Sequence, residues 1–152
     1  MRISAKADYA VRAAIELAAA PDEKPVSAER IATAQEIPLN FLENILGELR
    51  TAGIVRSQRG AEGGFRLAKG ADQLTIADII RAVEGPLATV RGGKPEDAEY
   101  PGPATALPRV WIAVRKNLRS VVEHVTVADV ASSQLPDKID LLAQEPEAWV
   151  TR

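Results

Sequence analysis

The stretch from residue 59 to residue 67 constrains the fold of this chain more than any other. It reads Arg-Gly-Ala-Glu-Gly-Gly-Phe-Arg-Leu and joins two short β-leaning runs at 54–58 and 65–68. A glycine-rich turn between two such runs predicts a β-hairpin. The hairpin carries an arginine at its tip and directly follows a segment with a helix–turn–helix pattern. This combination is typical of a winged helix-turn-helix, and it favours a protein that binds DNA.

Three helices are predicted before the hairpin. The alanine-rich segment 4–20 is expected to form the first, with Ser4 as its N-cap. A short second helix is expected to begin after Ser27. The third covers about 39–52, where apolar side chains recur at helical spacing, and Gly53 supplies a left-handed stop. The opposite face of this third helix is polar and small, so one side can fill a core while the other enters a groove.

After the hairpin the sequence predicts a fourth helix and, beyond a loop, a long fifth helix. Thr75, followed three residues later by Asp78, resembles a capping box that starts a helix ending near Glu84. Beyond the loop, apolar residues alternate spacings of four and three, which is typical of a coiled-coil seam and favours a partner helix. Packing on its own domain is the alternative for this helix. The predicted dimer seam is Leu107, Trp111, Val114, Leu118, Val121 and Val125.

These patterns predict a mainly α fold with one small β-hairpin. We expect a winged helix-turn-helix domain at 1–86, followed by a flexible loop at 87–106 that is rich in glycine and proline. Dimerisation helices are expected at 107–132, with another short helix beginning near Thr126. The remaining residues, 133–152, are expected to form an acidic C-terminal tail that is partly mobile.

Charge is distributed unevenly along the chain. The formal net charge of −2 does not indicate nucleic-acid binding by itself. Residues 50–69, however, hold five basic side chains and one acidic side chain, Glu62, a local net charge of +4. The positive field therefore coincides with the predicted hairpin, as a DNA-binding surface requires. A solvated basic face without a partner is the alternative reading.

Composition excludes several kinds of site. The chain has no cysteine and one histidine, His124, so disulfides, cysteine-bound zinc and cysteine-ligated iron–sulfur clusters are excluded. His124 has no evident partners and is interpreted as structural. No apolar run is long enough to span a membrane, and the N-terminus lacks the apolar core of a secretory signal, so we expect a cytoplasmic protein. No acid–base pair or nucleotide-binding motif stands out, which makes an enzyme a remote possibility.

Four stretches resemble the Rrf2 family of bacterial transcription regulators, the IscR-, NsrR- and CymR-like proteins. They are the opening MRISAKADYAVRA, the third-helix sequence IPLNFLENIL, the hairpin RGAEGGFRL and the fourth-helix sequence TIADIIRAVEGP. The resemblance covers roughly residues 1–131. It implies a homodimer that binds a palindromic operator, with the third helix in the major groove and the wing in the adjacent minor groove.

The resemblance also implies which side chains contact DNA. By position, Asn40, Glu43 and Asn44 would face bases, with Glu43 accepting from cytosine amino groups. Phe41 stands where the family often has tyrosine, and Arg59 is the strongest candidate for insertion into a narrow minor groove. Lys6, Ser27 and Arg50 would contact phosphates. The full set of DNA-contact candidates is Lys6, Ser27, Asn40, Phe41, Glu43, Asn44, Arg50, Arg59, Gly60, Gly63 and Gly64. For the three glycines, the simpler explanation is that they form a tight turn.

The sequence departs from the family at its best-known sensor. Well-known members of the family hold an iron–sulfur cluster with three cysteines in the loop before the long helix, and sometimes an acidic residue of the first helix completes the site. This loop has no thiol, and Asp8 at the acidic position cannot hold a cluster alone. We therefore expect a dimeric repressor without a cofactor. Its effector is expected to be either a small molecule, bound in a pocket near Trp111, or a protein. The alternative is a winged-helix protein-interaction module controlled by an enzyme partner.

Overall fold

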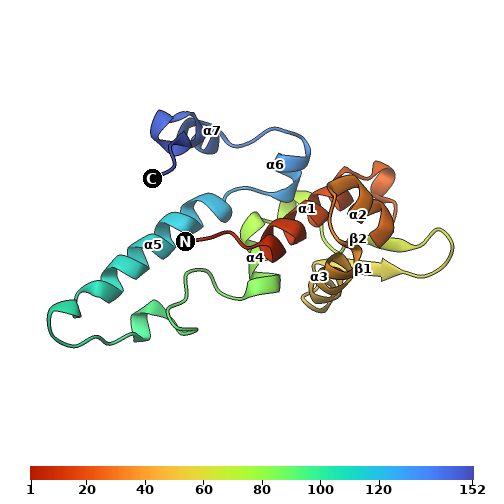
Figure 1. The fold of residues 1–152 in the computed structure, drawn as a ribbon. Helices are drawn as coiled ribbons and strands as arrows, with labels where there is room; N and C mark the ends of the chain where they lie inside the picture. The colour runs from red at the N-terminus through yellow and green to blue at the C-terminus, as the bar shows by residue number, and fades with distance from the viewer.

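The computed structural model describes residues 1–152, except for the side chain of Glu23. A winged lobe contains the first four helices and the hairpin, and the fifth helix extends away from it (Figure 1). The elements are α1 (Ala5–Ala19), η1 (Pro21–Glu23), α2 (Ala28–Gln35), α3 (Leu39–Thr51), β1 (Val55–Gln58), β2 (Gly64–Leu67), η2 (Ala71–Gln73), α4 (Ile76–Glu84), η3 (Pro95–Asp97), η4 (Gly102–Ala104), α5 (Leu107–Val122), α6 (Val127–Ala131), α7 (Asp137–Gln144) and η5 (Pro146–Trp149). The predicted mainly α fold with one hairpin is confirmed.

Helix α1 forms the centre of the core. Ala10, Ala13 and Ala14 are completely buried on it, and their small side chains let α3, α4 and α6 pack closely around its axis. Large apolar residues of the surrounding elements complete the core: Ile31, Leu42, Leu46, Leu49, Val55, Leu74, Ile79 and Val127. The winged lobe is therefore a packed scaffold that fixes the position of α3 and of the hairpin base.

The first four helices begin and end close to where the sequence predicts. The Ser4 hydroxyl accepts from the Ala7 N–H at 3.0 Å, and the Ser27 hydroxyl accepts from the Arg30 N–H at 3.2 Å. Thr75 and Asp78 form the reciprocal capping box at the start of α4. Gly53 adopts φ +76° after α3. Each of the three N-cap hydroxyls satisfies an otherwise unpaired backbone donor, which typically stabilises a helix by about 1 kcal/mol.

Strand β2 of the hairpin is tied to the residue before the N-cap of α2. Val26 and Phe65 exchange two backbone hydrogen bonds of 2.8 Å each, which add a short third antiparallel segment beside β2. Gly64 makes this approach possible, because a Cβ at that position would lie 2.5 Å from the Val26 carbonyl. Gly63 similarly lies against the Gln58 carbonyl inside the turn. Both glycines are thus required by close backbone packing.

The segment between α4 and α5 contains local structure. It includes η3 and η4 and a tight turn in which Val90 and Gly93 exchange backbone hydrogen bonds of 2.9 Å. Pro95 is buried, and Arg115 of α5 contacts Glu96 at 2.8 Å. The flexibility expected of 87–106 stays a prediction.

The C-terminal region differs from the sequence prediction at two places. Helix α5 ends at Val122, and Val125 is buried in its own protomer, so the prediction that Val125 continues the dimer seam is wrong. The physical reason is a β-bridge between Thr75 and Thr126, within which the Val125 carbonyl accepts from the Ile76 N–H at 2.9 Å. The bridge draws the backbone out of the helix. In addition, the segment expected to form only a tail contains α7 and η5.

Candidate nucleic-acid interface

Helix α3 turns one face into the core and another outward. Leu42, Ile45, Leu46 and Leu49 are buried, and at 100° per residue the positions opposite them are Asn40, Asn44, Gly47 and Thr51. We call this outward set the α3 ridge. Its side chains are uncharged and offer amide and hydroxyl groups for hydrogen bonding. They are also short, so the helix backbone could approach a DNA groove closely. The ridge is the part of the molecule best suited to reading base edges.

Charged and aromatic residues flank the α3 ridge. Glu43 and Arg50 lie along one side, and both are exposed. Phe41, 64% exposed, and Glu48 lie along the other side, which faces α1. Between α1 and α3 lies an open groove of about 950 Å³ whose lining includes Phe41 and Glu48. The α3 candidates are therefore gathered around one ridge, although Phe41 and Glu43 point to opposite sides of it.

Lys6 lies at the same groove and is engaged by an ion pair. Its Nζ lies 2.8 Å from a carboxylate oxygen of Glu48, and both side chains are about two-fifths exposed. Such a half-exposed pair contributes little to stability, so a phosphate can replace the carboxylate as a partner. A direct role of Lys6 in phosphate binding stays a prediction.

The tip of the wing presents Arg59. The turn is closed by a hydrogen bond of 3.0 Å from the Gly63 N–H to the Gly60 carbonyl, and Gly60 has φ +110°. Arg59 is exposed, and no carboxylate pairs with it among the side chains that the structure describes. Its guanidinium is therefore available to a DNA groove. The hairpin projects beyond α2 and α3 (Figure 1).

Ser27 and the wing share one anchor. Ser27 caps α2 directly after Val26, the residue that bridges to Phe65. The N-terminal end of α2 carries unpaired backbone N–H groups and a partial positive charge, which suits a phosphate. The bridge places this end beside strand β2, one residue from Gly64, where the turn of the hairpin ends.

Two further arginines of the hairpin were not among the site residues predicted from the sequence. Arg56 and Arg66 are direct cross-strand neighbours and are both exposed. With Lys69 they line a cavity of about 340 Å³ beside the C-terminal end of α1. Like charges placed opposite each other in a sheet repel, and an anion between them removes the repulsion. The signal was present in the local charge of +4, but the strand register was needed to show that the two arginines face each other.

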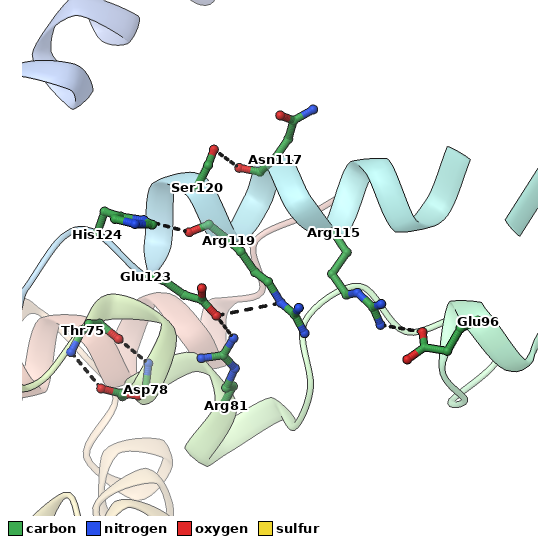
Figure 2. A network of polar contacts seen from close by, with 10 residues as sticks. All are labelled: Thr75, Asp78, Arg81, Glu96, Arg115, Asn117, Arg119, Ser120, Glu123 and His124. Carbon is green, nitrogen blue, oxygen red and sulfur yellow. Dashed lines mark hydrogen bonds and ion pairs between the residues drawn. The ribbon is translucent and has the colours of Figure 1, made fainter. Parts of the chain in front are cut away.

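An ion-pair network joins the winged lobe to α5 (Figure 2). Arg81 of α4 contacts Glu123 at the end of α5, and Arg119 approaches the same carboxylate at 3.8 Å. The hydrogen bond from Arg81 holds the pKa of Glu123 below its ordinary value. Beside the middle of α5, the pKa of Glu96 is lowered first by a backbone hydrogen bond to its carboxylate and then by Arg115. The contacts of Arg81 and Arg119 with Glu123 join the end of α5 to α4 of the winged lobe.

His124 lies just after the C-terminal end of α5 (Figure 2). Its Nδ1 lies 3.3 Å from the Arg119 carbonyl oxygen. This contact with a helix-terminal carbonyl fits the structural role expected for the only histidine of the chain.

Comparison with known proteins decides the family. A sequence model of the Rrf2 family, described as an iron-dependent transcriptional regulator, matches residues 3–133. The chain belongs to the Rrf2 family. It is 49% identical to a helix-turn-helix transcriptional regulator of Mycobacterium tuberculosis H37Rv over 97% of its own length and 92% of that protein. It is also 38% identical to the regulator CymR of Bacillus subtilis, over 87% of its own length and 91% of that protein.

Solved structures of relatives have the same fold. The structure of CymR, described as the global cysteine regulator of B. subtilis, superposes with a TM-score of 0.74 at 37% identity, covering 88% of this chain and 98% of that one. IscR of T. potens gives a TM-score of 0.69 at 30% identity over 100% of this chain and 93% of its own. The protein is therefore a winged helix-turn-helix transcriptional regulator of a DNA-binding family, and the family is one of regulators rather than enzymes.

The residues of this chain do not fit the iron site that the family description implies. Cysteine is absent from the whole sequence. Asp8, at the position of an acidic ligand, instead pairs with Arg12 of the next helical turn at 2.9 Å. Within the part of the chain whose side chains are described, no three His, Cys, Asp or Glu residues gather closely enough to hold a metal ion. The described helices also include none that is long and apolar enough to cross a membrane.

Proposed function

We propose that this protein is a homodimeric repressor that binds a palindromic operator through the α3 ridge and the wing. The observation that carries the proposal is the joint exposure of the uncharged ridge on α3 and of Arg59 at the wing tip, with strand β2 fixed beside the start of α2. An arrangement of this kind supports contact with a major groove and the adjacent minor groove at once.

Each element of the surface has a distinct part in recognition. The amides of Asn40 and Asn44 can each make paired hydrogen bonds to an adenine, and Glu43 can accept from a cytosine amino group. Arg59 is attracted to a narrow minor groove, where the negative potential is enhanced. Ser27, Lys6 and Arg50, together with the newly found Arg56, Arg66 and Lys69, are proposed to position the protein on phosphates without reading sequence.

Helix α5 is proposed as the dimerisation element. None of its residues is buried in the protomer, and Val110 of the apolar side is 51% exposed. The remaining seam residues, Leu107, Trp111, Val114, Leu118 and Val121, are only partly covered. Pairing two such helices would bury these side chains and place two winged lobes on half-sites separated by a helical turn of DNA or a multiple of it. Such a dimer acts where the bacterial chromosome lies, in the cytoplasm.

The signal received by the repressor is proposed to be something other than an iron–sulfur cluster. A cavity of about 290 Å³ lies between the segment after α4 and α5, with Val90, Tyr100 and Trp111 in its lining. This volume suits a small apolar effector, and a protein effector is the other candidate.

Fluorescence anisotropy with a labelled duplex from the region upstream of the gene tests DNA binding. We expect preference over a scrambled duplex and a steep loss of affinity as salt increases, because phosphate neutralisation releases counterions. Arg59→Ala should weaken binding to the specific duplex by about 1–3 kcal/mol, whereas Arg152→Ala, in the exposed C-terminal segment, should have no effect. Equal affinity for both duplexes would contradict sequence-specific recognition and favour a protein-interaction module.

A further inference from the structure

Helix α3 carries an exposed aromatic side chain in its first turn. Phe41 follows Leu39 and Asn40 at the start of the helix and is 64% exposed. Between residues 4 and 109 it is the only large aliphatic or aromatic side chain that is exposed among those that the structure describes. A single exposed apolar side chain is ordinary on a protein surface, so the position of Phe41 matters more than its exposure.

Phe41 lies on the flank of the α3 ridge that faces α1. At 100° per residue it is about 60° around the helix from Asn44, and both residues line the groove between α1 and α3. In a helix-turn-helix, residues at the start of the recognition helix are those that contact base edges in the major groove. The phenyl ring is therefore a neighbour of the amide that is proposed to read bases.

The same flank of α3 meets a cation about two turns further along the helix. Glu48 follows Phe41 by seven residues, and the Lys6 Nζ lies 2.8 Å from its carboxylate. Because Lys6 is proposed above to contact a phosphate, the backbone of one DNA strand would pass along this flank. The C5 methyl group of thymine projects into the major groove on the side of its own strand. A side chain on the flank of the helix is therefore well placed to meet such a methyl group.

We propose that Phe41 contacts the C5 methyl group of a thymine in the operator, beside the base pair that Asn44 contacts. A phenyl ring has no hydrogen-bonding group, and apolar contact with this methyl group is the form of base recognition open to it. The contact distinguishes thymine from cytosine, because cytosine has no methyl group at C5. The inference rests on the operator binding proposed above, to which it adds a specificity-determining residue.

Duplexes that differ only in this methyl group test the contact. The labelled duplex from the region upstream of the gene is made once with thymine and once, by amplification with dUTP, with uracil in place of every thymine. Uracil pairs as thymine does and lacks only the C5 methyl group. Anisotropy should show about fourfold weaker binding of the parent protein to the uracil duplex for each methyl group contacted, since burying one such group contributes about 0.8 kcal/mol.

Substitutions assign the preference for thymine to Phe41. Phe41→Ala should bind the two duplexes with nearly equal affinity, whereas Phe41→Tyr, which keeps the ring, should retain the preference. Leu141→Ala is the matched control, because it truncates an apolar side chain of similar exposure, 65%, on α7. Arg59→Ala should weaken binding to both duplexes and keep their ratio, since a minor-groove contact does not involve the methyl group.

A second measurement locates the contact within the operator. The thymines of the half-site found by footprinting are replaced by uracil one at a time. We expect the loss of affinity at one position in each half-site, with the two positions related by the symmetry of the operator. The other thymines of the half-site are the internal controls, and a loss spread evenly over all of them would overturn the contact by one ring.

The outcomes separate this inference from the proposed function. Specific binding with the same thymine preference in Phe41→Ala as in the parent would overturn the inference and leave operator binding intact. A loss in Phe41→Ala that is equal on both duplexes would place the ring against deoxyribose and overturn the methyl contact. Equal affinity of the parent protein for the upstream and the scrambled duplex would refute operator binding itself, and the methyl contact with it.

Discussion

The first and the fifth helices have similar lengths but opposite environments. Helix α1 has 15 residues and buries five of them in the protomer, whereas α5 has 16 residues and buries none. The alanines of α1 allow neighbours to pack closely, so its contacts are satisfied within one chain. Helix α5 has larger apolar residues along one side, and these remain partly uncovered. The difference teaches that α1 buries its apolar residues within one protomer, while the apolar side of α5 remains free for the partner helix proposed above.

The strongest test of this comparison removes apolar volume from the core. Leu46→Ala should lower the free energy of unfolding by about 2–5 kcal/mol, because Leu46 is completely buried and its removal leaves a cavity. Urea unfolding followed by circular dichroism measures the change. Leu141→Ala at the exposed surface of α7 is the control, with an expected change within about 0.5 kcal/mol. Equal effects of the two substitutions would contradict the assignment of the core.

The same truncation on α5 should act on association instead. Leu118→Ala is expected to weaken dimerisation by about 1–3 kcal/mol while the circular dichroism spectrum of the lobe is retained, because the Leu118 side chain lies in the proposed seam. Sedimentation equilibrium measures the dissociation constant. Asn117→Ala, on the neighbouring exposed position, serves as the control. If Leu118→Ala unfolds the lobe without changing association, α5 belongs to the protomer core and the comparison fails.

A third substitution separates stability from function inside the winged lobe. Gly47 lies within α3 on the ridge, and a Cβ there would meet nothing within 4 Å. Gly47→Ala should raise the free energy of unfolding by about 0.5–1 kcal/mol, since alanine restricts the unfolded chain and favours the helix. The same methyl group should weaken binding to the operator if the ridge enters the groove closely. Thermal unfolding and anisotropy measure the two effects, and unchanged DNA affinity would argue against close approach at Gly47.

The smallest expected effect concerns the connection between the two regions. The pKa of Glu123 is lowered in the folded state, mainly by Arg81, so its contribution to stability is present above the ordinary glutamate pKa of about 4.3 and is lost as pH falls below it. Thermal unfolding of Glu123→Gln should therefore show a deficit against the parent protein at pH 7 that disappears in acid. Glu147→Gln, whose side chain is 81% exposed, is the control. A deficit that persists unchanged in acid would exclude the ion pair as its cause.

Local signals account for what the sequence predicted well. Ser4, Ser27 and Thr75 mark helix starts because their hydroxyls satisfy nearby backbone donors, and Gly53 marks an end because its left-handed φ suits glycine. The hairpin followed from its glycine-rich turn. Each of these depends on residues close together in the chain, so the fold class and the starts and ends of the first four helices could be predicted.

Contacts between distant residues account for what the sequence did not predict. Val125 continues the apolar spacing of α5, yet the bridge between Thr75 and Thr126 removes it from the helix. The pairing of Arg56 with Arg66 depends on a strand register that composition does not give. The DNA contacts of the ridge and wing stay predictions, because they depend on a partner molecule as well as on this chain.

The bridge between Val26 and Phe65 has a mechanical consequence for regulation. Because it joins the wing to the helix-turn-helix by two backbone hydrogen bonds, and Gly64 allows the two backbones to touch, the wing cannot swing independently of α2 and α3. The spacing between the two proposed groove contacts of one protomer is then constant. In the proposed dimer, an effector would therefore switch DNA binding by changing the distance or angle between the two protomers, and we propose that α5, linked to α4 through Arg81 and Glu123, transmits this change.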